Sequence, residues 1–520
     1  MYAAVVPAGV RFAELLGGLS LACDLADGFP PEKVLRTALL AVEIARHHGL
    51  DDELARDAFY VSFLRYTGCT AFAHEEAHIY GAGDDIGTRS VMALADAARP
   101  LSVVGGIVRG IGAGASAVER VRAVARMLGD PAVVAKHAHS QCETSVRFAR
   151  LLGLGEAVRA ALRQICERWD GKGNPQRAAG DALSMAMRLS HVADVAEIAH
   201  HRDGREACVA FVRRCAGGWL DPALAATFLA NADELLGSLE GPSVWERCLD
   251  AEPRPFAQAS EARLDDVATL FAHMVDLKST FTLGHSTGVA DLAVRAAATA
   301  VVGSDEATLL RRAALLHDVG RACVPNSVWD KPGRLSAGEW ERVRLHAYYT
   351  ERIVWRAPAL RELAAVAAAG HERLDGHGYH RGLPASLLPK SARLLAAADA
   401  WHAMSEPRPH RAALDPNTAR KNLLDDVASG RLDRDAVSAV LEAASGFRPR
   451  VPAAWPAGLS DREVEVLRLV ARGRSNKEIA VALDISPRTV QHHVEHVYGK
   501  IEVSSRAAAA LFATENGLLG

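Results

Sequence analysis

The stretch Leu315–Arg321, LLHDVGR, sets a histidine and an aspartate side by side, after two leucines and ahead of a glycine and a basic residue. Imidazole and carboxylate groups on adjacent residues can both reach one metal ion. The leucines would anchor that turn of helix in an apolar core. A His-Asp pair alone is a weak signal because such dipeptides are common, so its meaning depends on the rest of the chain.

Further candidate ligands occur in segments where apolar residues are spaced as on a helix face. Together with the His-Asp pair they make a set of six, His285, His317, Asp318, His346, His371 and Asp399. Imidazoles and carboxylates without a thiolate favour Fe, Mn, Zn, Co or Mg over a structural zinc. Two such ions, bridged by Asp318, could activate water for an in-line phosphoryl displacement. The alternative is a set of ordinary core or surface histidines, since the chain has 21 of them.

The composition predicts a folded, mostly helical protein. The 520 residues are 49% hydrophobic and 24% charged, which suggests about three domains and excludes a disordered chain. Apolar residues recur at helical spacing, as at Leu264, Val267, Leu270 and Phe271, whereas regular alternation over a strand length is hard to find. The expected fold class is all-α.

Charge and cysteine usage bear on partners and compartment. A formal net charge of −3 gives no overall basic bias, so any nucleic-acid binding must be local. The eight cysteines include no CxxC pair, which favours a reduced, intracellular protein. The N-terminus has no basic region ahead of its apolar residues, so no signal peptide is expected. We therefore expect a cytoplasmic protein without membrane contact.

Two proline-containing linkers, at 240–261 and 446–458, break the helical periodicity. They predict three domains, at residues 1–245, 255–447 and 457–520. The first two resemble a diverged repeat: ERWDGKGNP at 167–175 matches ERLDGHGYH at 372–380, and in both copies a second aspartate follows the shared one by 24 residues. FLRYTGC at 63–69 lies in register with LLHDVGR, so Arg65-Tyr66 replaces the His-Asp pair, and Cys166 replaces His371. The first copy is predicted to keep the scaffold and to lack the ligands.

Taken in order, the motifs of the second copy resemble the HD superfamily of metal-dependent phosphohydrolases, and its HD-GYP subfamily in particular. The resemblance covers about residues 270–410. It implies an all-helical domain with one or two divalent iron or manganese ions, which hydrolyses cyclic di-GMP with Asp318 between the ions and Arg321 on the phosphate. The matching stretches are LGHS at 283–286, LLHDVGR at 315–321, KPGRL at 331–335, GHERLDGHGYH at 370–380 and AADAWHAM at 397–404.

Four positions depart from that family pattern. Gly370 replaces the first histidine of the family's HH pair, which removes one ligand of a second metal. Arg321 replaces a lysine, so a planar fork takes the place of a compact ammonium, and His380 replaces the proline of the GYP motif. Phe281 stands where a glutamate ligand of a third metal is expected, so a trinuclear site is not predicted. The simplest HD ligand set, at 285, 317, 318 and 399, is intact.

A second metal motif, HEEAH at 74–78, has the spacing of a zinc-peptidase signature. His74 and His78 would share one helix face, with Glu75 as the base. No third ligand follows at the expected spacing, and matches of this length arise often by chance. A polar helix start with two histidines is the preferred interpretation.

The segment 459–519 contains the start and stop signals of four helices. Serines at 460, 475, 486 and 504–505 precede the helical stretches as N-caps. Glu463 would complete a capping box, and Pro487 suits the first turn of the third helix. That helix has an apolar stripe formed by Val490, Val494, Val497 and Ile501. A short helix, a tight turn and a longer helix indicate a helix-turn-helix.

This segment resembles the LuxR-type DNA-binding domain over its whole length, through LSDREVEVLRLVARG, SNKEIA and ISPRTVQHHV. The resemblance implies that the helix from Pro487 enters the major groove of double-stranded DNA, with Gln491 and His492 facing bases. It also implies a homodimer contact through the fourth helix, at 506–513. The residues at phosphate-contacting positions are Lys477, Arg488, Thr489, Lys500 and Ser505.

Residues 457–520 hold eight basic and eight acidic side chains, and Glu495 would repel phosphate, so we expect modest, salt-dependent DNA affinity. A helical protein–protein module is the alternative. The whole chain predicts a transcription regulator whose HD-GYP-like module binds a metal and a nucleotide, cyclic di-GMP or another, to control the LuxR-type domain. The rival hypothesis is an active cyclic di-GMP phosphodiesterase with an attached DNA-binding domain.

Overall fold

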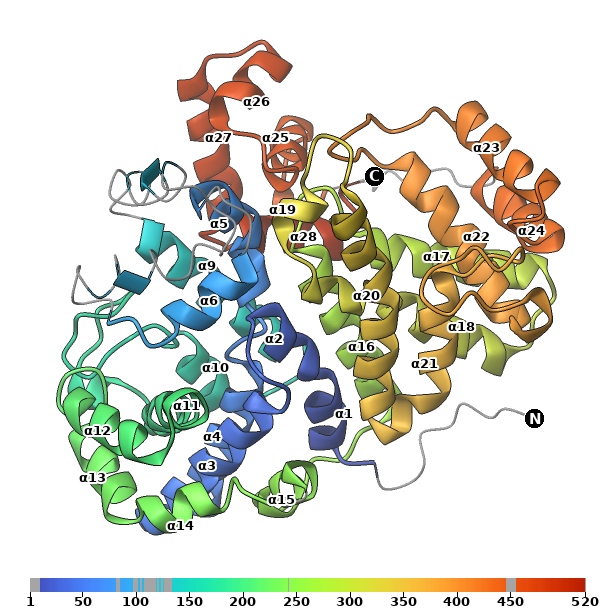
Figure 1. The fold of residues 1–520 in the computed structure, drawn as a ribbon. Helices are drawn as coiled ribbons and strands as arrows, with labels where there is room; N and C mark the ends of the chain where they lie inside the picture. The colour runs from blue at the N-terminus through green and yellow to red at the C-terminus, as the bar shows by residue number, and fades with distance from the viewer. Residues whose placement is uncertain are drawn as a thin grey trace. The chain divides into compact units, whose positions relative to one another are not determined.

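The computed structural model describes residues 10–80, 85–96, 133–241, 243–445 and 455–519, together with single residues between 102 and 125. Over these residues the regular elements are helices (Figure 1), and extended backbone pairs only in isolated bridges, which confirms the all-α prediction. The chain forms two compact units, Gly9–Ala259 and Ser260–Gly520, which we call the N-terminal and C-terminal units. None of the described helices has the length and apolar character that crossing a membrane requires.

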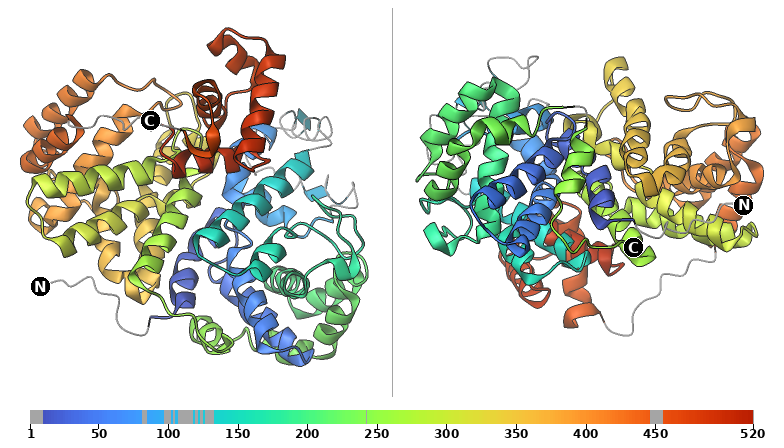
Figure 2. Two further views of the ribbon diagram at one scale, coloured as in Figure 1. Left: turned by 180° about the vertical axis from the view of Figure 1, so that it is seen from behind. Right: turned by 90° about the horizontal axis from the view of Figure 1, so that it is seen from below.

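The N-terminal unit is built around three helices that pack against one another, α3 (Lys33–His47), α4 (Asp52–Leu64) and α11 (Met185–Asp203). Their contacting faces are mainly leucine, isoleucine, valine and alanine at helical spacing. Other helices complete the unit (Figure 2). Their bounds are α1 (Phe12–Leu19), α2 (Leu21–Ala26), α5 (Ala73–Tyr80), α6 (Asp85–Met92), α9 (Val133–Leu151), α10 (Glu156–Leu162), α12 (Arg205–Cys215), α13 (Pro222–Ala230), α14 (Ala232–Gly237) and α15 (Val244–Ala251).

In the first part of the C-terminal unit, α17 (His285–Thr299) packs against α18 (Ser304–Leu316), α22 (Lys390–Ser405) and α24 (Arg434–Ser445). A capping box of Ser336 and Glu339 starts α20 (Ala337–Arg356), which packs against the short 3-10 helix η3 (Val319–Cys323). The remaining elements are α16 (Glu261–Asp276), α19 (Asn326–Trp329), η4 (Pro358–Leu360), α21 (Arg361–Ala368), η5 (Ala369–His371), η6 (Ala385–Leu387) and α23 (Pro416–Ala428).

The last part of the C-terminal unit holds the helix-turn-helix, with α25 (Asp461–Ala471), α26 (Asn476–Leu483), α27 (Pro487–Lys500) and α28 (Arg506–Glu515). The predicted caps are confirmed, because Ser460 and Ser475 form capping boxes and Ser486 and Ser505 cap the two later helices. The apolar stripe of α27 is buried, as predicted. Local capping therefore determines where each helix of this part begins.

The repeated loop has the same internal contacts in both units. The carboxylates of Glu167 and Glu372 each accept a hydrogen bond from a backbone N–H nine residues later, at 2.6 and 3.1 Å. A Cβ on Gly173 would lie 2.4 Å from the Cα of Glu167, and one on Gly378 would lie 2.5 Å from the Cα of Glu372. Because any side chain would collide with backbone, these glycines are required, and the motif stays recognisable in both copies.

In both copies a second glycine lies close to backbone of another helix. It comes two residues after the pair that differs between the copies, His317-Asp318 in one and Arg65-Tyr66 in the other. A Cβ on Gly320 would lie 2.0 Å from the carbonyl oxygen of His346, and one on Gly68 would lie 2.3 Å from that of Gln141. The same backbone contact therefore occurs in both units. It places Gln141 in the N-terminal unit where His346 stands in the C-terminal unit.

Candidate metal centre and DNA-binding helix

Six helical elements bring the six candidate ligands into one buried cluster. His285 is the first residue of α17, His317 follows the end of α18, and Asp318 precedes η3. The other three lie within α20, at the end of η5 and within α22. All six are buried, with at most 8% of any residue exposed. Residues up to 114 positions apart along the chain thus face one point, which helical spacing alone does not guarantee.

Asp318 stands at the centre of this cluster. Its Oδ1 lies 3.2 Å from the Nε2 atoms of both His346 and His371. Its Oδ2 lies 3.6 Å from the Nε2 atoms of His285 and His317. The two carboxylate oxygens therefore face two different pairs of imidazoles, which is the arrangement expected of a bridging ligand.

Asp399, on α22, is the second carboxylate of the cluster. Its Oδ1 lies 3.2 Å from His285 Nε2 and 3.7 Å from His317 Nε2, and its Oδ2 lies 3.3 Å from His371 Nδ1. Two groups of three ligand atoms each fit within 4.8 Å: one from His285, His317 and Asp399, the other from His317, Asp318 and His371. Either group could hold one ion.

The hydrogen bonds of two histidines test whether a cation fits here. His317 Nδ1 contacts the carbonyl oxygen of Ala314 at 2.7 Å, and His346 Nδ1 contacts that of Val343. A carbonyl only accepts, so each Nδ1 carries a proton, and in the neutral ring each Nε2 presents a lone pair to the cluster. Both Nε2 atoms are buried without a hydrogen-bond partner. Backbone-oriented imidazoles with lone pairs facing carboxylates match the outer-shell pattern of metal-binding histidines.

The protonation of the cluster agrees with such a site. Burial lowers the pKa of His346 to about 4, so this imidazole is neutral, as a ligand must be. Burial alone would raise the pKa values of Asp318 and Asp399, but the surrounding imidazoles hold both well below their usual range. Burial likewise opposes the charging of His285, yet Glu406 and Asp399 raise its pKa to about 10. In the protein without an ion, protonated imidazoles balance the buried carboxylates.

Two residues of this region escape sequence reasoning. Glu406 accepts a hydrogen bond from His285 Nδ1 at 2.9 Å, and His402 lies 3.2 Å from Glu406. With His285 they form a further group of three metal-binding side chains. Both follow Asp399 on or just after α22, so the spacing of Asp399 and His402 along that helix was the available signal.

A cavity of about 920 Å³ opens over the cluster. Its lining includes the cationic side chains of Arg321, Lys331, Arg408 and Arg411, beside the aromatic rings of Trp329, Trp340 and Tyr379. Arg321 donates to Asp318 Oδ2 at 2.8 Å and lies over the Trp329 ring, 4.1 Å from its centroid. The volume lies within the range of ligand sites, and its cations suit a phosphate-containing molecule.

The positions that depart from the family pattern also border this region. A Cβ on Gly370 would lie 3.8 Å from the ring of His317, so the missing histidine leaves its space next to that ligand. Phe281 lines the cavity with an apolar ring where a glutamate was expected. His380 lies aside, with its Nε2 3.6 Å from Glu351. Of the four departures, Gly370, Phe281 and Arg321 thus border the site, and His380 bears on the loop beside it.

The N-terminal unit replaces the ion by side-chain cations. Asp194 on α11 corresponds to Asp399, and Arg65 and Tyr66 contact it at 3.2 and 2.9 Å. Lys33 is the first residue of α3, as His285 is the first of α17, and its Nζ also binds Asp194. The sequence predicted that Arg65, Tyr66 and Cys166 replace metal ligands of the other copy. The structure adds Lys33, which stands in the place of His285. An ammonium and a guanidinium take up the charge of the aspartate that an ion would otherwise meet.

The HEEAH motif lies on α5, in the same unit. Glu76 of this motif does not face a metal site; it accepts from Arg89 at 2.6 Å and contacts His137 at 2.9 Å. The side chain of His78 lies outside the described residues, so the predicted His74–His78 pair stays a prediction.

On the helix-turn-helix, most predicted DNA contacts are exposed. Arg488, Thr489, Gln491 and His492 are exposed on α27, and Lys477 is exposed on α26. Gln491 donates to Glu495 at 2.7 Å, so in the free protein the acidic neighbour holds one of the base-facing groups.

Two further predicted contacts have partners inside the domain. Lys500 binds the carboxylate of Glu463 at 2.7 Å and a backbone carbonyl at 3.0 Å. Ser505 is buried and accepts from the N–H of Ala508 as the cap of α28. Both must share or exchange these bonds to reach a phosphate.

Comparison with known proteins assigns families to these parts. The family model described as HD domain matches residues 269–436, and the one for bacterial regulatory proteins of the luxR family matches residues 457–513. The 3'3'-cGAMP-specific phosphodiesterase 3 of Vibrio cholerae is 31% identical over 409 residues, covering 77% of this chain and 88% of the relative. The cyclic di-GMP phosphodiesterase response regulator RpfG of Xanthomonas campestris is 29% identical over 178 residues, covering 34% of this chain and 47% of the relative.

A solved structure agrees. The crystal structure of the cyclic GMP-AMP specific phosphodiesterase V-cGAP3 of V. cholerae matches with a TM-score of 0.58 and 26% identity, over 84% of this chain and 99% of that chain. Fold and site define a tandem HD-type protein with a degenerate first copy and a LuxR-type helix-turn-helix. The chain belongs to the HD-GYP family of HD-domain proteins. HD-domain phosphodiesterases depend on metal ions, and the His/Asp cluster is the candidate site for them here.

Proposed function

We propose that this protein is a DNA-binding transcription regulator whose HD-GYP domain binds one or two divalent ions, iron or manganese, and hydrolyses a cyclic dinucleotide. The observation that carries the proposal is the cluster around Asp318 and Asp399, with its lone-pair-bearing imidazoles at the floor of a cavity of about 920 Å³. The proposal divides the chain into a degenerate HD domain at 1–245, an HD-GYP domain at 255–447 and a DNA-reading domain at 457–520.

The proposed substrate is 3'3'-cGAMP rather than cyclic di-GMP. The relative described as specific for 3'3'-cGAMP aligns over 77% of the chain, whereas the cyclic di-GMP relative RpfG aligns over 34%. Both are cyclic dinucleotides with two phosphodiesters. Arginines and aromatic rings in the cavity suit phosphates and bases respectively.

The chain's own residues have defined roles in this proposal. The ligands are His285, His317, Asp318, His346, His371 and Asp399, and a bound ion would lower the pKa of water and polarise a phosphoryl oxygen. Arg321 balances the charge of Asp318, and Arg321 and Arg408, which both line the cavity, would contact the phosphates of the substrate. The stacked ring of Trp329 keeps the Arg321 guanidinium in place.

Metal content and turnover test the proposal together. Purified wild-type protein is expected to contain iron or manganese and to cleave 3'3'-cGAMP faster than cyclic di-GMP. Asp318→Asn should lose bound metal and turnover, because the amide cannot bridge ions as a carboxylate does. Asp291→Asn, which alters an exposed aspartate on α17, is the matched control and should change neither.

Three outcomes separate the possibilities. Protein without transition metal, even after reconstitution, contradicts the metal centre. Protein that contains metal and binds the nucleotide without cleaving it would be a nucleotide sensor and not an enzyme. Equal cleavage of both nucleotides contradicts the substrate assignment alone.

The DNA-binding part is tested by footprinting. Arg488→Ala should weaken protection at all sites, because its position is expected to contact phosphate, whereas Gln491→Ala should change which sequences are protected. Protection that neither variant alters contradicts α27 as the reading helix.

A further inference from the structure

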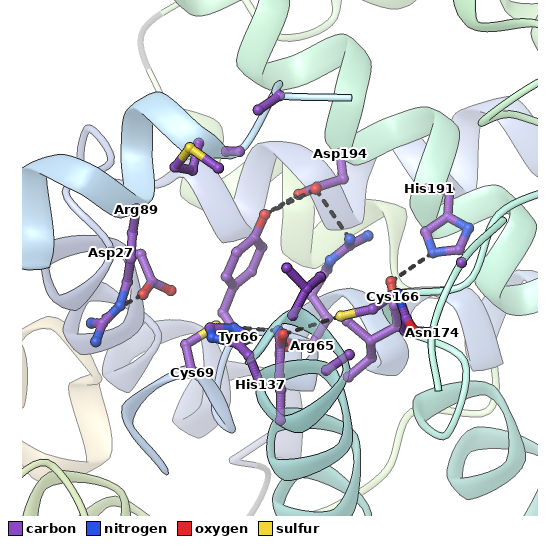
Figure 3. A pocket seen from close by; sticks show the side chains of 18 of the residues that line it. Asp27, Arg65, Tyr66, Cys69, Arg89, His137, Cys166, Asn174, His191 and Asp194 are labelled. Carbon is purple, nitrogen blue, oxygen red and sulfur yellow. Dashed lines mark hydrogen bonds and ion pairs between the residues drawn. The ribbon is translucent and has the colours of Figure 1, made fainter. Parts of the chain in front are cut away.

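The N-terminal unit contains a cavity of about 300 Å³ at the place that corresponds to the metal centre. It lies beside α11 and the loop of Cys166, and Figure 3 shows its polar side chains. Most of its wall is apolar, formed by Phe29, Phe72, Ile165, Val195 and Trp219 together with smaller side chains. A cavity of this size lies at the lower end of the range for small-molecule sites. Apolar walls give water few partners, so the cavity suits an apolar occupant better than solvent.

Most of the charged groups in the wall are paired with one another, whereas one carboxylate oxygen of Glu167 has no hydrogen-bond partner among the described residues. Figure 3 shows Arg65 and Tyr66 both directed at Asp194, which also binds Lys33. Lys33 Nζ lies 3.7 Å from the centroid of the Tyr66 ring, so a cation–π contact adds to the ion pair. The ammonium therefore has two partners inside the protein before any ligand binds.

The other two arginines of the described lining are paired as well. Arg89 lies 2.6 Å from Glu76 and 3.6 Å from Asp27, and Arg168 lies 2.8 Å from Asp96. A phosphate or carboxylate entering the cavity would have to break a buried ion pair, which leaves a buried carboxylate uncompensated. A metal ion would meet cations where the C-terminal unit offers imidazoles. Both the substrate class and the cofactor of the metal centre are thus disfavoured here.

One donor among the lining residues has no hydrogen-bond partner in the described part of the protein. The guanidinium of Arg65 is buried, and its Nε–H has no hydrogen-bond partner among the described residues. Its NH1 group donates to Ser190, and its NH2 group faces Asp194. A buried donor without a partner is costly, so an acceptor oxygen of a bound molecule would remove that cost.

We propose that this cavity is a binding site for an uncharged, mainly apolar small molecule that carries a hydrogen-bond-accepting oxygen. The degenerate HD domain is then a ligand-binding domain. In place of an ion site and a nucleotide site it has an apolar cavity, whose charged side chains are mostly paired with one another. The proposal stands on this unit alone and does not depend on hydrolysis in the other.

Prodan, an uncharged dialkylamino-naphthalene ketone, is the probe for this site. Full-length wild-type protein should bind it with one site per chain and a blue-shifted emission. Ala138→Leu places a larger side chain in the wall on α9 and should weaken binding at least about ten-fold. Ala157→Leu, an equal change at an exposed position of α10, should leave the affinity within about two-fold of wild type.

A second variant covers the case in which Ala138→Leu does not fold. Trp219→Phe keeps an aromatic wall and should reduce energy transfer from tryptophan to bound prodan, whereas Trp245→Phe, on α15, should not. Absence of prodan binding overturns the proposal, as does unchanged binding or transfer in the wall variants. Displacement of prodan by 3'3'-cGAMP or inorganic phosphate also overturns it, since the site would then accept anions. Loss of cyclic dinucleotide turnover has no bearing on these outcomes.

Discussion

Asp194 and Asp399 occupy corresponding places in the two units and are balanced by different cations. Asp399 faces imidazoles that carry protons in the protein without an ion and could exchange them for a metal ion, whereas Asp194 is held by Lys33, Arg65 and Tyr66. The positive charge that balances Asp399 has to be bound from solution. The positive charge that balances Asp194 is part of the chain, so the N-terminal unit needs no ion to hold a buried carboxylate.

Asp194→Asn should therefore destabilise the N-terminal unit without affecting metal binding. Removing one partner of a buried ion pair costs about 3–5 kcal/mol, because the other charges are left uncompensated. Hydrogen exchange of α3 and α11 measures the loss of protection, and elemental analysis measures the metal. Asp203→Asn, an exposed change at the end of the same helix, is the control. Wild-type protection in Asp194→Asn would refute this account.

Gly320→Ala should weaken metal binding although it changes no ligand. The added Cβ would lie 2.0 Å from the carbonyl oxygen of His346, so η3 and α20 must separate, and with them Asp318 and His346. Displaced ligand geometry is expected to lower metal affinity by about 10–100-fold. Metal titration of the apoprotein measures this, with Gly338→Ala, which has open space around its Cα, as the control. An unchanged metal affinity would show that η3 and α20 can separate without moving the ligands.

At the scale of elements, α27 carries both the groups that are proposed to read DNA and one that would oppose them. Glu495 is exposed on the same helix as Arg488 and accepts a hydrogen bond from Gln491. A negative charge at this position would repel the phosphates of bound DNA. The helix is therefore built for modest affinity in its free form.

Glu495→Ala should strengthen DNA binding several-fold at low salt, with a smaller gain as salt rises. The variant removes a negative charge near the phosphates and releases Gln491, and the electrostatic part of the effect is screened by salt. Fluorescence anisotropy with a promoter fragment over a range of salt concentrations measures it. Glu465→Ala, on the exposed side of α25, should have a smaller effect. Equal effects of both variants would mean that α27 is not the helix on the DNA.

At the scale of the whole molecule, the proposed function couples a nucleotide site to a DNA site. If the nucleotide changes the affinity for DNA by some factor, DNA must change the affinity for the nucleotide by the same factor. Factors of about 5–150 are usual for such coupling. The direction is not needed for the test, because reciprocity holds for both activation and release.

A non-hydrolysable phosphorothioate analogue of 3'3'-cGAMP should show this reciprocity. Its dissociation constant, measured with and without promoter DNA, should shift by the factor that the analogue imposes on DNA binding. In Arg488→Ala, DNA should no longer shift the affinity for the analogue. Two unequal factors would show that the analogue or the DNA acts at an additional site, and two factors of one would refute regulation by the nucleotide.

Local patterns predicted much of this molecule. The helical class, the caps of α25 to α28 and the buried stripe of α27 depend on residues within one or two turns of each other, and all are confirmed. The repeated loop was recognisable because Gly173 and Gly378 have no room for a side chain. Glu406 and His402 were missed, since the helical spacing of Asp399 and His402 is by itself too weak a signal to separate them from solvent-facing polar residues.

The sequence by itself determined that this is a helical protein with an HD-GYP motif series, a copy lacking its His-Asp pair and a LuxR-type helix-turn-helix. These follow from spacing, turn chemistry and capping, which act between near neighbours. Only the tertiary structure decided that Lys33 neutralises Asp194, 161 residues away, and that Gln141 stands in the place of His346. It also decided that one unit presents lone pairs to an ion while the other encloses a charge-balanced, apolar cavity. The physical reason is that counter-charges in a low-dielectric interior are matched by whatever packing brings within contact, regardless of distance along the chain.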